Sequence, residues 1–207
     1  MVPQGRLGVL KFNSNGKSAG QFSKAGGVHC SIVTAGDEEF LLSGPNNQKG
    51  NTDVYMASGL KDGNLACNVS KAVFGVASNG IVYTNNGRKL AAVDVKQRAD
   101  LQRRAELLKR KAAKGITPEE KAEYKAIPSK IAKTVQWEVD SAPAFDMIIV
   151  GDHIVVGSAG KVVVYLADLG EEIWEANVEG NALGLAYANG RLYVSTDLGH
   201  IFTFTSL

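Results

Sequence analysis

The chain of 207 residues is 44% hydrophobic, contains 23 glycines and has a formal net charge of +2. This length and apolar content are enough for a sizeable buried core, and so many glycines favour a turn-rich β protein. No apolar run is long enough to span a membrane, and the first residues lack the basic start and apolar stretch of a signal peptide. The composition therefore excludes membrane-spanning helices and leaves the localisation open.

The first elements in chain order are one isolated strand and one unit of three strands. Residues 6–13 alternate apolar and polar and have no partner before them. We therefore expect them to be the outer strand of an incomplete blade that belongs to a preceding or partner segment. The unit that follows has a first turn at Gly36 and Asp37 and a polar loop at residues 44–51 (from Gly44 to Asn51). Its strands are residues 28–33, 40–43 and 53–58.

Three later segments, residues 73–95, 147–167 and 183–205, share one plan of three short β-type runs joined by two tight turns. The first turns are Asn79-Gly80, Gly151-Asp152 and Asn189-Gly190. The second turns contain Gly87, Gly160 and Gly199. A reversal between paired strands often needs a positive φ, which glycine adopts at little cost. The last two units are 38 residues apart, and recurrence at such a period is typical of a blade array.

Residues 96–133 separate the second unit from the third and consist almost entirely of helix formers. An apolar stripe with helical spacing runs along the first half: Leu101, Ala105, Leu108 and Ala112. Thr117 as N-cap, Pro118 after it and Glu120 three residues after the cap start a second helix, which Pro128 kinks or stops. The segment is predicted to be a helical hairpin.

The predicted fold is mainly β: one domain over residues 1–207, built as a partial β-propeller of about four four-stranded antiparallel blades with an inserted α-helical hairpin at residues 96–133. We expect the hairpin to project between the outer strand of the second blade and the inner strand of the third. Four inner positions should be buried: Val150, Val156, Leu185 and Val194.

The charge is distributed unevenly along the chain. Residues 96–133 hold 12 Lys and Arg against 5 Asp and Glu, a net charge of +7, so the rest of the chain carries −5. One interpretation is a contact arm for an anionic partner, and the other is a solvated helical pair that its lysines keep soluble. The cations that would make the contact are Arg103, Arg104, Lys109, Arg110 and Lys111.

The joints between units carry a family resemblance. Ala167 and Asp168 are followed by Gly170, and Trp174 comes four residues after that glycine; elsewhere Trp137 follows the inserted segment. These joints resemble the repeats of propellers like the pyrroloquinoline-quinone (PQQ) dehydrogenases. The resemblance covers nearly the whole chain outside the insertion. It implies that both tryptophans pack between blades, with the indole N–H bonded to a carbonyl.

Members of that enzyme class hold Ca²⁺ on the propeller axis through Glu, Asn and Asp and stack the quinone on a tryptophan, often opposite adjacent cysteines. This chain has no Cys-Cys pair, and its three histidines, His29, His153 and His200, are scattered. Turn capping explains Ser195, Thr196 and Asp197 without a catalytic triad. We therefore assign no catalytic, cofactor-binding or metal-binding residues and expect no cofactor; PQQ and calcium enter only under the enzyme alternative.

Three functions are compatible with this sequence. The first, which we favour, is a non-catalytic PQQ-like propeller module for protein interaction or scaffolding, similar to those of bacterial exported proteins. The second is a fragment of a PQQ-dependent quinoprotein oxidoreductase. The third is a half-ring completed by a homodimer. The partner is accordingly a protein, the remaining propeller blades or a second copy. Cys30 and Cys67 form one disulfide or are two buried thiols, and we favour the thiols.

Overall fold

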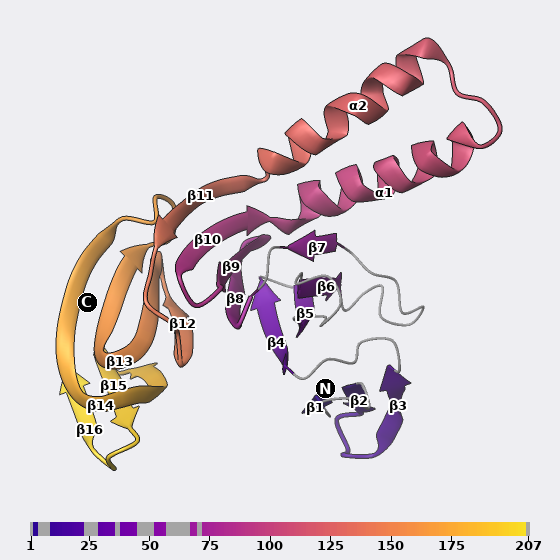
Figure 1. The fold of residues 1–207 in the computed structure, drawn as a ribbon. Helices are drawn as coiled ribbons and strands as arrows, with labels where there is room; N and C mark the ends of the chain where they lie inside the picture. Colours follow the sequence, from indigo (N-terminus) through magenta and orange to yellow (C-terminus); the bar gives the residue numbers. More distant parts are fainter. Residues whose placement is uncertain are drawn as a thin grey trace.

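The computed structural model describes residues 2–3, 9–22, 29–35, 38–44, 52–56, 67–69 and 72–205, with side chains at 10, 12–20, 67–69 and 72–205. These residues form antiparallel sheets and one helical hairpin (Figure 1). The predicted turn at Gly36 and Asp37, loop residues 45–51 and the Cys30 side chain lie outside the described residues.

The first three sheets follow the chain in order. The N-terminal sheet contains β1 (Val2–Pro3), β2 (Val9–Phe12) and β3 (Ser18–Phe22). The first blade contains β4 (His29–Ala35), β5 (Glu38–Gly44), β6 (Thr52–Met56) and β7 (Cys67–Val69). The second blade contains β8 (Phe74–Ser78), β9 (Ile81–Asn85), β10 (Lys89–Asp94) and β11 (Val135–Asp140).

The remaining strands are β12 (Asp146–Val150), β13 (His153–Leu166), β14 (Glu172–Ala188), β15 (Arg191–Thr196) and β16 (Ile201–Phe204). A straight strand as long as β13 would separate its ends by about 45 Å. The Ala167 N–H nevertheless donates to the Asp152 carbonyl at 2.8 Å, so β13 folds back on itself. The reversal falls at exposed Ala159 and Gly160, where Gly160 has a φ of 72°. The predicted second turn of this unit is thereby confirmed.

Strand β14 belongs to two blades. Its first half pairs with the second half of β13, and its second half, from Ala182, pairs with β15. The third blade therefore consists of β12, the two halves of β13 and the first half of β14. The fourth blade consists of the second half of β14, β15 and β16.

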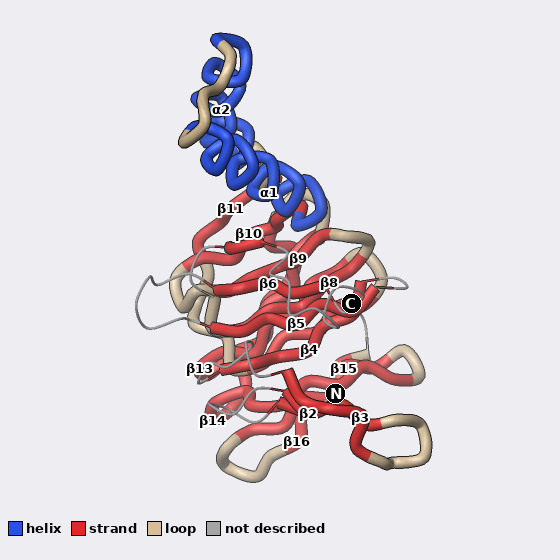
Figure 2. Tube along the Cα trace, turned by 90° about the vertical axis from the view of Figure 1, so that its right-hand side faces the viewer, coloured by secondary structure: helices blue, strands red, loops and turns tan. Residues whose placement is uncertain are grey.

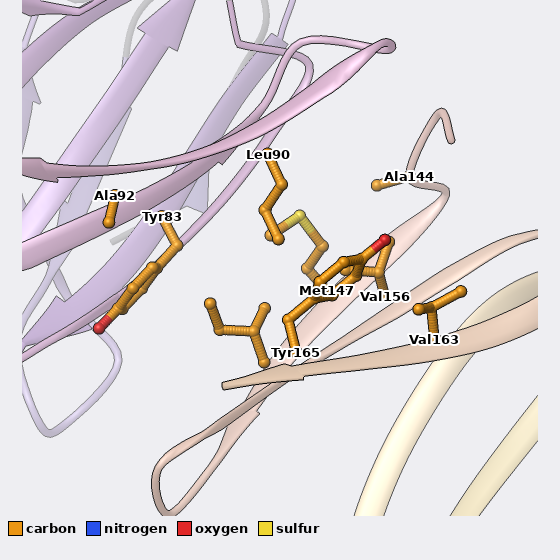
Figure 3. Packing of buried hydrophobic residues seen from close by; sticks show 9 residues of the cluster. Tyr83, Leu90, Ala92, Ala144, Met147, Val156, Val163 and Tyr165 are labelled. Atoms are coloured by element: carbon orange, nitrogen blue, oxygen red, sulfur yellow. The ribbon is translucent and has the colours of Figure 1, made fainter. Parts of the chain in front are cut away.

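The blades are arranged around a common axis as a partial propeller, as predicted. Strands β4, β8, β12 and the second half of β14 are the innermost of their sheets and contact one another in this order (Figure 1). Neighbouring blades pack face to face through hydrophobic clusters. Figure 3 shows one such cluster, in which Leu90 of the second blade faces Met147 and Tyr165 of the third. Each large side chain buried in this way contributes about 1.5–3 kcal/mol to folding.

The predicted inner positions are buried to different degrees. Val156 and Val194 are fully buried, at 1% and 0% exposure, whereas Val150 and Leu185 are half-buried at the edge of the cluster between the third and fourth blades. Cys67 is also buried, in the cluster between the first and second blades.

The helical hairpin consists of α1 (Val95–Ala112) and α2 (Pro118–Ala132), which project from one end of the strands (Figure 2). Its predicted position between the second and third blades is wrong, because β11 pairs with β10 and completes the second blade. The ends of the insertion lie together, with the Asp94 N–H bonded to the Thr134 carbonyl at 2.9 Å, so the hairpin replaces a turn between adjacent strands. Thr117 forms the predicted capping box, and α2 continues past Pro128.

Residues 6–13 are not a stray outer strand. The part of this segment that the structure describes contains β2, which pairs with β1 on one side and β3 on the other. Alternation along residues 6–13 predicted a strand, but β1 has only two residues and β3 contains Gly20, so neither carries a β pattern. The fourth strand of the first blade, β7, has three residues and was missed for the same reason.

Candidate interaction site: blade joints, hairpin and last blade

The joint between the second and third blades is built around Trp137. Its indole N–H donates to the Ala167 carbonyl at 3.0 Å. Its six-membered ring lies on Gly170, where a Cβ would approach the ring carbon Cε3 to 2.5 Å. Tyr83 packs nearby with a ring-centroid distance of 5.9 Å, and burial raises the pKa of its hydroxyl. Trp137 thus has the predicted packing role, and its ring leaves no room for a side chain at Gly170.

The second and third blades repeat one outer-strand register. Ala92 of β10 lies opposite Trp137, and Val164 of β13 lies opposite Trp174. In both blades the register shifts at the next residue of the third strand, which marks a β-bulge. Trp137 and Trp174 therefore occupy equivalent positions.

Two ion pairs complete this repeat. Lys89 pairs with Glu138 at 2.6 Å in the second blade, and Lys161 pairs with Glu175 at 2.6 Å in the third. Each pair crosses from the third strand to the outer strand at the same register. Because the side chains of both pairs are half-exposed, solvent screens the charges and the pairs contribute little to stability. Sequence reasoning missed them, although the lysine that precedes each third-strand apolar run was a usable signal.

Trp174 lacks the joint contacts that Trp137 makes. Its ring meets Phe204 edge-on, with centroids 5.1 Å apart. Within the described residues its indole N–H makes no hydrogen bond and is not among the buried unbonded atoms, so it faces solvent. The packing predicted for Trp174 is present, but the predicted hydrogen bond is absent.

The outer face of the fourth blade is open. The bond from the Ala167 N–H to the Asp152 carbonyl fixes the register of the hairpin within β13, and the pairing of Leu192 with Phe204 fixes that of the hairpin formed by β15 and β16. When the two hairpins are aligned in these registers, Ile201 of the fourth blade takes the position of Val162 of the third. Val162 is 0% exposed because the fourth blade covers it, whereas Ile201 is 74% exposed. An isolated exposed isoleucine is ordinary, but the sheet face that carries Ile201 is the one whose equivalent in the third blade is buried.

The base of the hairpin is docked on the first blade. The Gln102 side chain accepts from the Asn68 N–H at 2.8 Å and donates to the Asn68 carbonyl at 3.2 Å. Arg98 donates to the same carbonyl at 2.6 Å and to the Thr134 hydroxyl at 3.0 Å, and burial lowers its pKa. The outer edge of β7 is therefore covered, as sheet edges in native proteins usually are. Nothing in the sequence pattern pointed to this contact.

The distal part of the hairpin is a charged surface. Four of the five predicted contact cations form ion pairs within the hairpin: Arg103–Asp100, Arg104–Glu123, Arg110–Glu106 and Lys111–Glu120. Within residues 95–133, the cations that make no ion pair within 4 Å include Lys109, Lys114, Lys121, Lys125 and Lys133. Sequence reasoning therefore located the charge but named mostly the paired cations.

Within their described residues, the four inner strands together contain one acidic residue, Asp146 on β12. One of its carboxylate oxygens accepts from the Met147 N–H at 2.9 Å and the other from the Leu185 N–H at 2.7 Å. The second bond ties the third blade to the fourth. Asp146 is thereby occupied by the backbone.

His153, His200 and Asp197 lie at or beside hairpin turns, whereas Ser195 and Thr196 end β15. His153 lies 2.9 Å from the carboxylate of its neighbour Asp152, and His200 lies 3.5 Å from that of Glu179. Asp197 accepts from the backbone and side chain of Asn181, at 2.7 and 2.6 Å. The side chains that the structure describes form no group of three or more metal-binding residues.

Comparison with known proteins identifies the fold. No family model and no curated protein matches the chain. Among solved structures, BamB from Moraxella catarrhalis matches 84% of this chain at 14% identity and a TM-score of 0.50. The fold is a partial β-propeller. The computationally designed Ika4 protein matches 86% of the chain at 10% identity and a TM-score of 0.54. A chain of the mitotic checkpoint complex matches 94% of the chain at 10% identity and a TM-score of 0.58.

These matches differ in how much of each known protein the chain spans. The partial propeller spans 41% of the BamB chain and 53% of the checkpoint-complex chain, but 92% of Ika4. It therefore has about half the length of the two natural chains. At such low identity the likeness concerns the fold alone. Among the described residues, neither helix is long and apolar enough to cross a membrane.

Proposed function

We propose that this partial propeller is a non-catalytic module with PQQ-like repeats that serves protein interaction or scaffolding. The observation that carries the proposal is the state of Asp146, the acidic residue of the described inner strands. Both of its carboxylate oxygens accept backbone N–H groups, one of them across a blade joint. A carboxylate that holds two blades together is unsuited to serve as an axial calcium ligand or as a catalytic base.

The tryptophans support the same conclusion. Trp137 uses its N–H on the Ala167 carbonyl and one ring face on Gly170, so that face is not available to a quinone. We propose accordingly that the module holds neither PQQ nor calcium. Its surface instead offers two features suited to protein contact, the open face of the fourth blade and the charged hairpin.

Titration with PQQ and Ca²⁺ tests this proposal, followed by absorbance and by the melting temperature. A PQQ-dependent dehydrogenase serves as the positive control. We expect no saturable change in either signal at concentrations that saturate the control. Saturable binding that raises the melting temperature would overturn the proposal and establish the quinoprotein alternative, since a ligand of the native state stabilises it by mass action.

For the hairpin we propose an acidic protein surface as partner, because its unpaired lysines extend over both helices and the loop between them. Poly-glutamate is a suitable probe. Wild-type chain should bind it weakly, with an affinity that falls steeply with salt. Lys121→Glu with Lys125→Glu should abolish retention, whereas Lys89→Glu, at the ion pair of the second blade, should not. Equal retention of both variants would exclude the hairpin.

A further inference from the structure

An exposed leucine on the hairpin is surrounded by cations. Leu107 of α1 is 53% exposed. On a helix surface the neighbours of a residue are those three and four positions away, and for Leu107 all four are basic: Arg103, Arg104, Arg110 and Lys111. Arg103 and Arg110 each use one nitrogen in an ion pair within α1, so other N–H groups of both side chains remain for a partner. We call Leu107 and these four cations the hairpin patch.

The hairpin patch faces away from the first blade. Gln102, which bonds Asn68 of β7, lies five residues before Leu107, and five residues turn an α-helix by about 140° beyond a full turn. Leu107 also lies about 18 Å along α1 from Val95, on the part of the hairpin that projects beyond the strands (Figure 2). The patch is therefore open to a partner.

The third blade carries a patch of the opposite charge at residues 168–173. Leu169 is 59% exposed and Ile173 is 44% exposed. The three acidic residues around them, Asp168, Glu171 and Glu172, are exposed as well. Within the described residues none of the three makes an ion pair within 4 Å. This turn patch therefore has an apolar centre and an acidic rim, where the hairpin patch has an apolar centre and a basic rim.

The two patches lie on equivalent connections of neighbouring blades. The hairpin joins β10 to β11, the third and outer strands of the second blade, and the turn patch joins the second half of β13 to β14 in the third blade. Trp137, which follows the hairpin, contacts Gly170 of the turn, so both connections lie at one end of the molecule. Within the described residues, however, no ion pair joins the hairpin to residues 135–205. The two patches therefore do not neutralise each other within one chain.

We propose that the hairpin patch of one copy of this chain binds the turn patch of a second copy, and that the contact is reciprocal about a two-fold axis. Such a pair is closed, because each copy contributes both patches once. This inference rests on the acidic protein surface proposed above as the partner of the hairpin, and it identifies that surface. A chain that stays monomeric would overturn this inference alone, since retention on poly-glutamate and the absence of PQQ binding are measured separately.

Charge complementarity favours a second copy as the partner. Residues 96–133 carry a net charge of +7, whereas residues 135–205 hold ten acidic and two basic side chains, a net charge of −8. The structure describes every residue of both segments. Opposite charges at the rims would steer two copies together, and the exposed leucines at the centres would be removed from water. A different acidic protein would satisfy the hairpin patch but leave the acidic turn patch unpaired.

Light scattering with a charge exchange tests the reciprocal pair. The hairpin variant carries Arg103→Glu and Arg110→Glu, and the turn variant carries Glu171→Lys and Glu172→Lys. We expect twice the mass of one chain for the wild type, with a dissociation constant that rises with salt. In each variant alone the dissociation constant should rise at least about a hundredfold, because like charges then face each other in both contacts. An equimolar mixture of the two variants should restore the pair, since the reversed hairpin then meets the reversed turn and the second contact keeps its original charges.

Lys121→Glu with Lys125→Glu is the matched control, because it reverses two cations of the same hairpin on α2, outside the hairpin patch. This control should weaken the pair far less than the hairpin variant does. Circular dichroism checks that each variant keeps its helices; if the hairpin variant does not, Leu107→Ser, which keeps every charge, should still raise the dissociation constant at least about tenfold. A wild-type monomer, a mixture that stays monomeric or grows into larger species, or equal effects of the control and the hairpin variant would each overturn the proposal.

Discussion

Replacing Gly170 with alanine should destabilise the propeller through the blade joint. The new Cβ would lie 2.5 Å from Cε3 and 2.7 Å from Cδ2 of the Trp137 ring, distances that force the ring or the turn to move. Overpacking of this kind costs about 1–3 kcal/mol. The φ of 70° adds about 1–2 kcal/mol, because alanine disfavours the left-handed region. We expect the free energy of unfolding to fall by about 2–5 kcal/mol in total.

Gly160→Ala separates the two costs. Gly160 has a φ of 72° but no atom within 4 Å of its added Cβ, so this variant carries the backbone strain alone. Urea unfolding followed by far-ultraviolet circular dichroism gives both values without relying on tryptophan fluorescence. A second comparison uses Trp137→Leu, whose smaller side chain should relieve the clash, so that the double variant loses less than the sum of the single variants. Equal losses for Gly170→Ala and Gly160→Ala, together with additivity in the double variant, would refute the joint contact.

Three further predictions concern the joint, the hairpin base and the hairpin charges. Trp137→Phe keeps an aromatic ring but loses the bond to the Ala167 carbonyl, so it should cost about 1 kcal/mol of unfolding free energy in urea titration, and no loss would deny that bond a role. Gln102→Leu should speed hydrogen exchange of the Asn68 N–H measured by NMR, and unchanged exchange would mean that α1 does not cover β7. Lys111 and the Thr117 N–H hold the pKa of Glu120 below its ordinary value of 4.5. Ionised Glu120 therefore stabilises the hairpin above pH 4.5, and this contribution should be lost as the pH falls through the lowered pKa. A helical circular dichroism signal that rose on acidification would contradict this sign.

Much of the fold was predictable because it is written in local patterns. Alternating runs with turn glycines placed the second, third and fourth blades, and the capping residues placed the start of α2. The position of the hairpin was not predictable, because a sequence pattern does not reveal which strands pair across an insertion. Residue 135 begins the outer strand of the second blade only because the two ends of the hairpin meet beside Asp94.

The candidate site was less predictable than the fold. Composition located the charge of the hairpin, but which cations remain unpaired depends on spatial neighbours such as Arg104 and Glu123, which are far apart in the sequence. The docking of Gln102 on the edge of β7 likewise joins residues that no local pattern connects. The spacing of Gly170 and Trp174 predicted a packing motif, yet its glycine proved to hold Trp137, from the preceding blade, rather than Trp174.

The most direct test of the central claim, that both tryptophans are joint residues and not part of a cofactor site, is hydrogen exchange of their indole N–H groups. The chain contains two tryptophans, so its NMR spectrum has two such signals. We predict a protected signal for Trp137 and a rapidly exchanging one for Trp174, and we expect neither signal to shift when PQQ and Ca²⁺ are added. Two equally rapid signals, or a signal of Trp137 that moves with PQQ, would contradict the account.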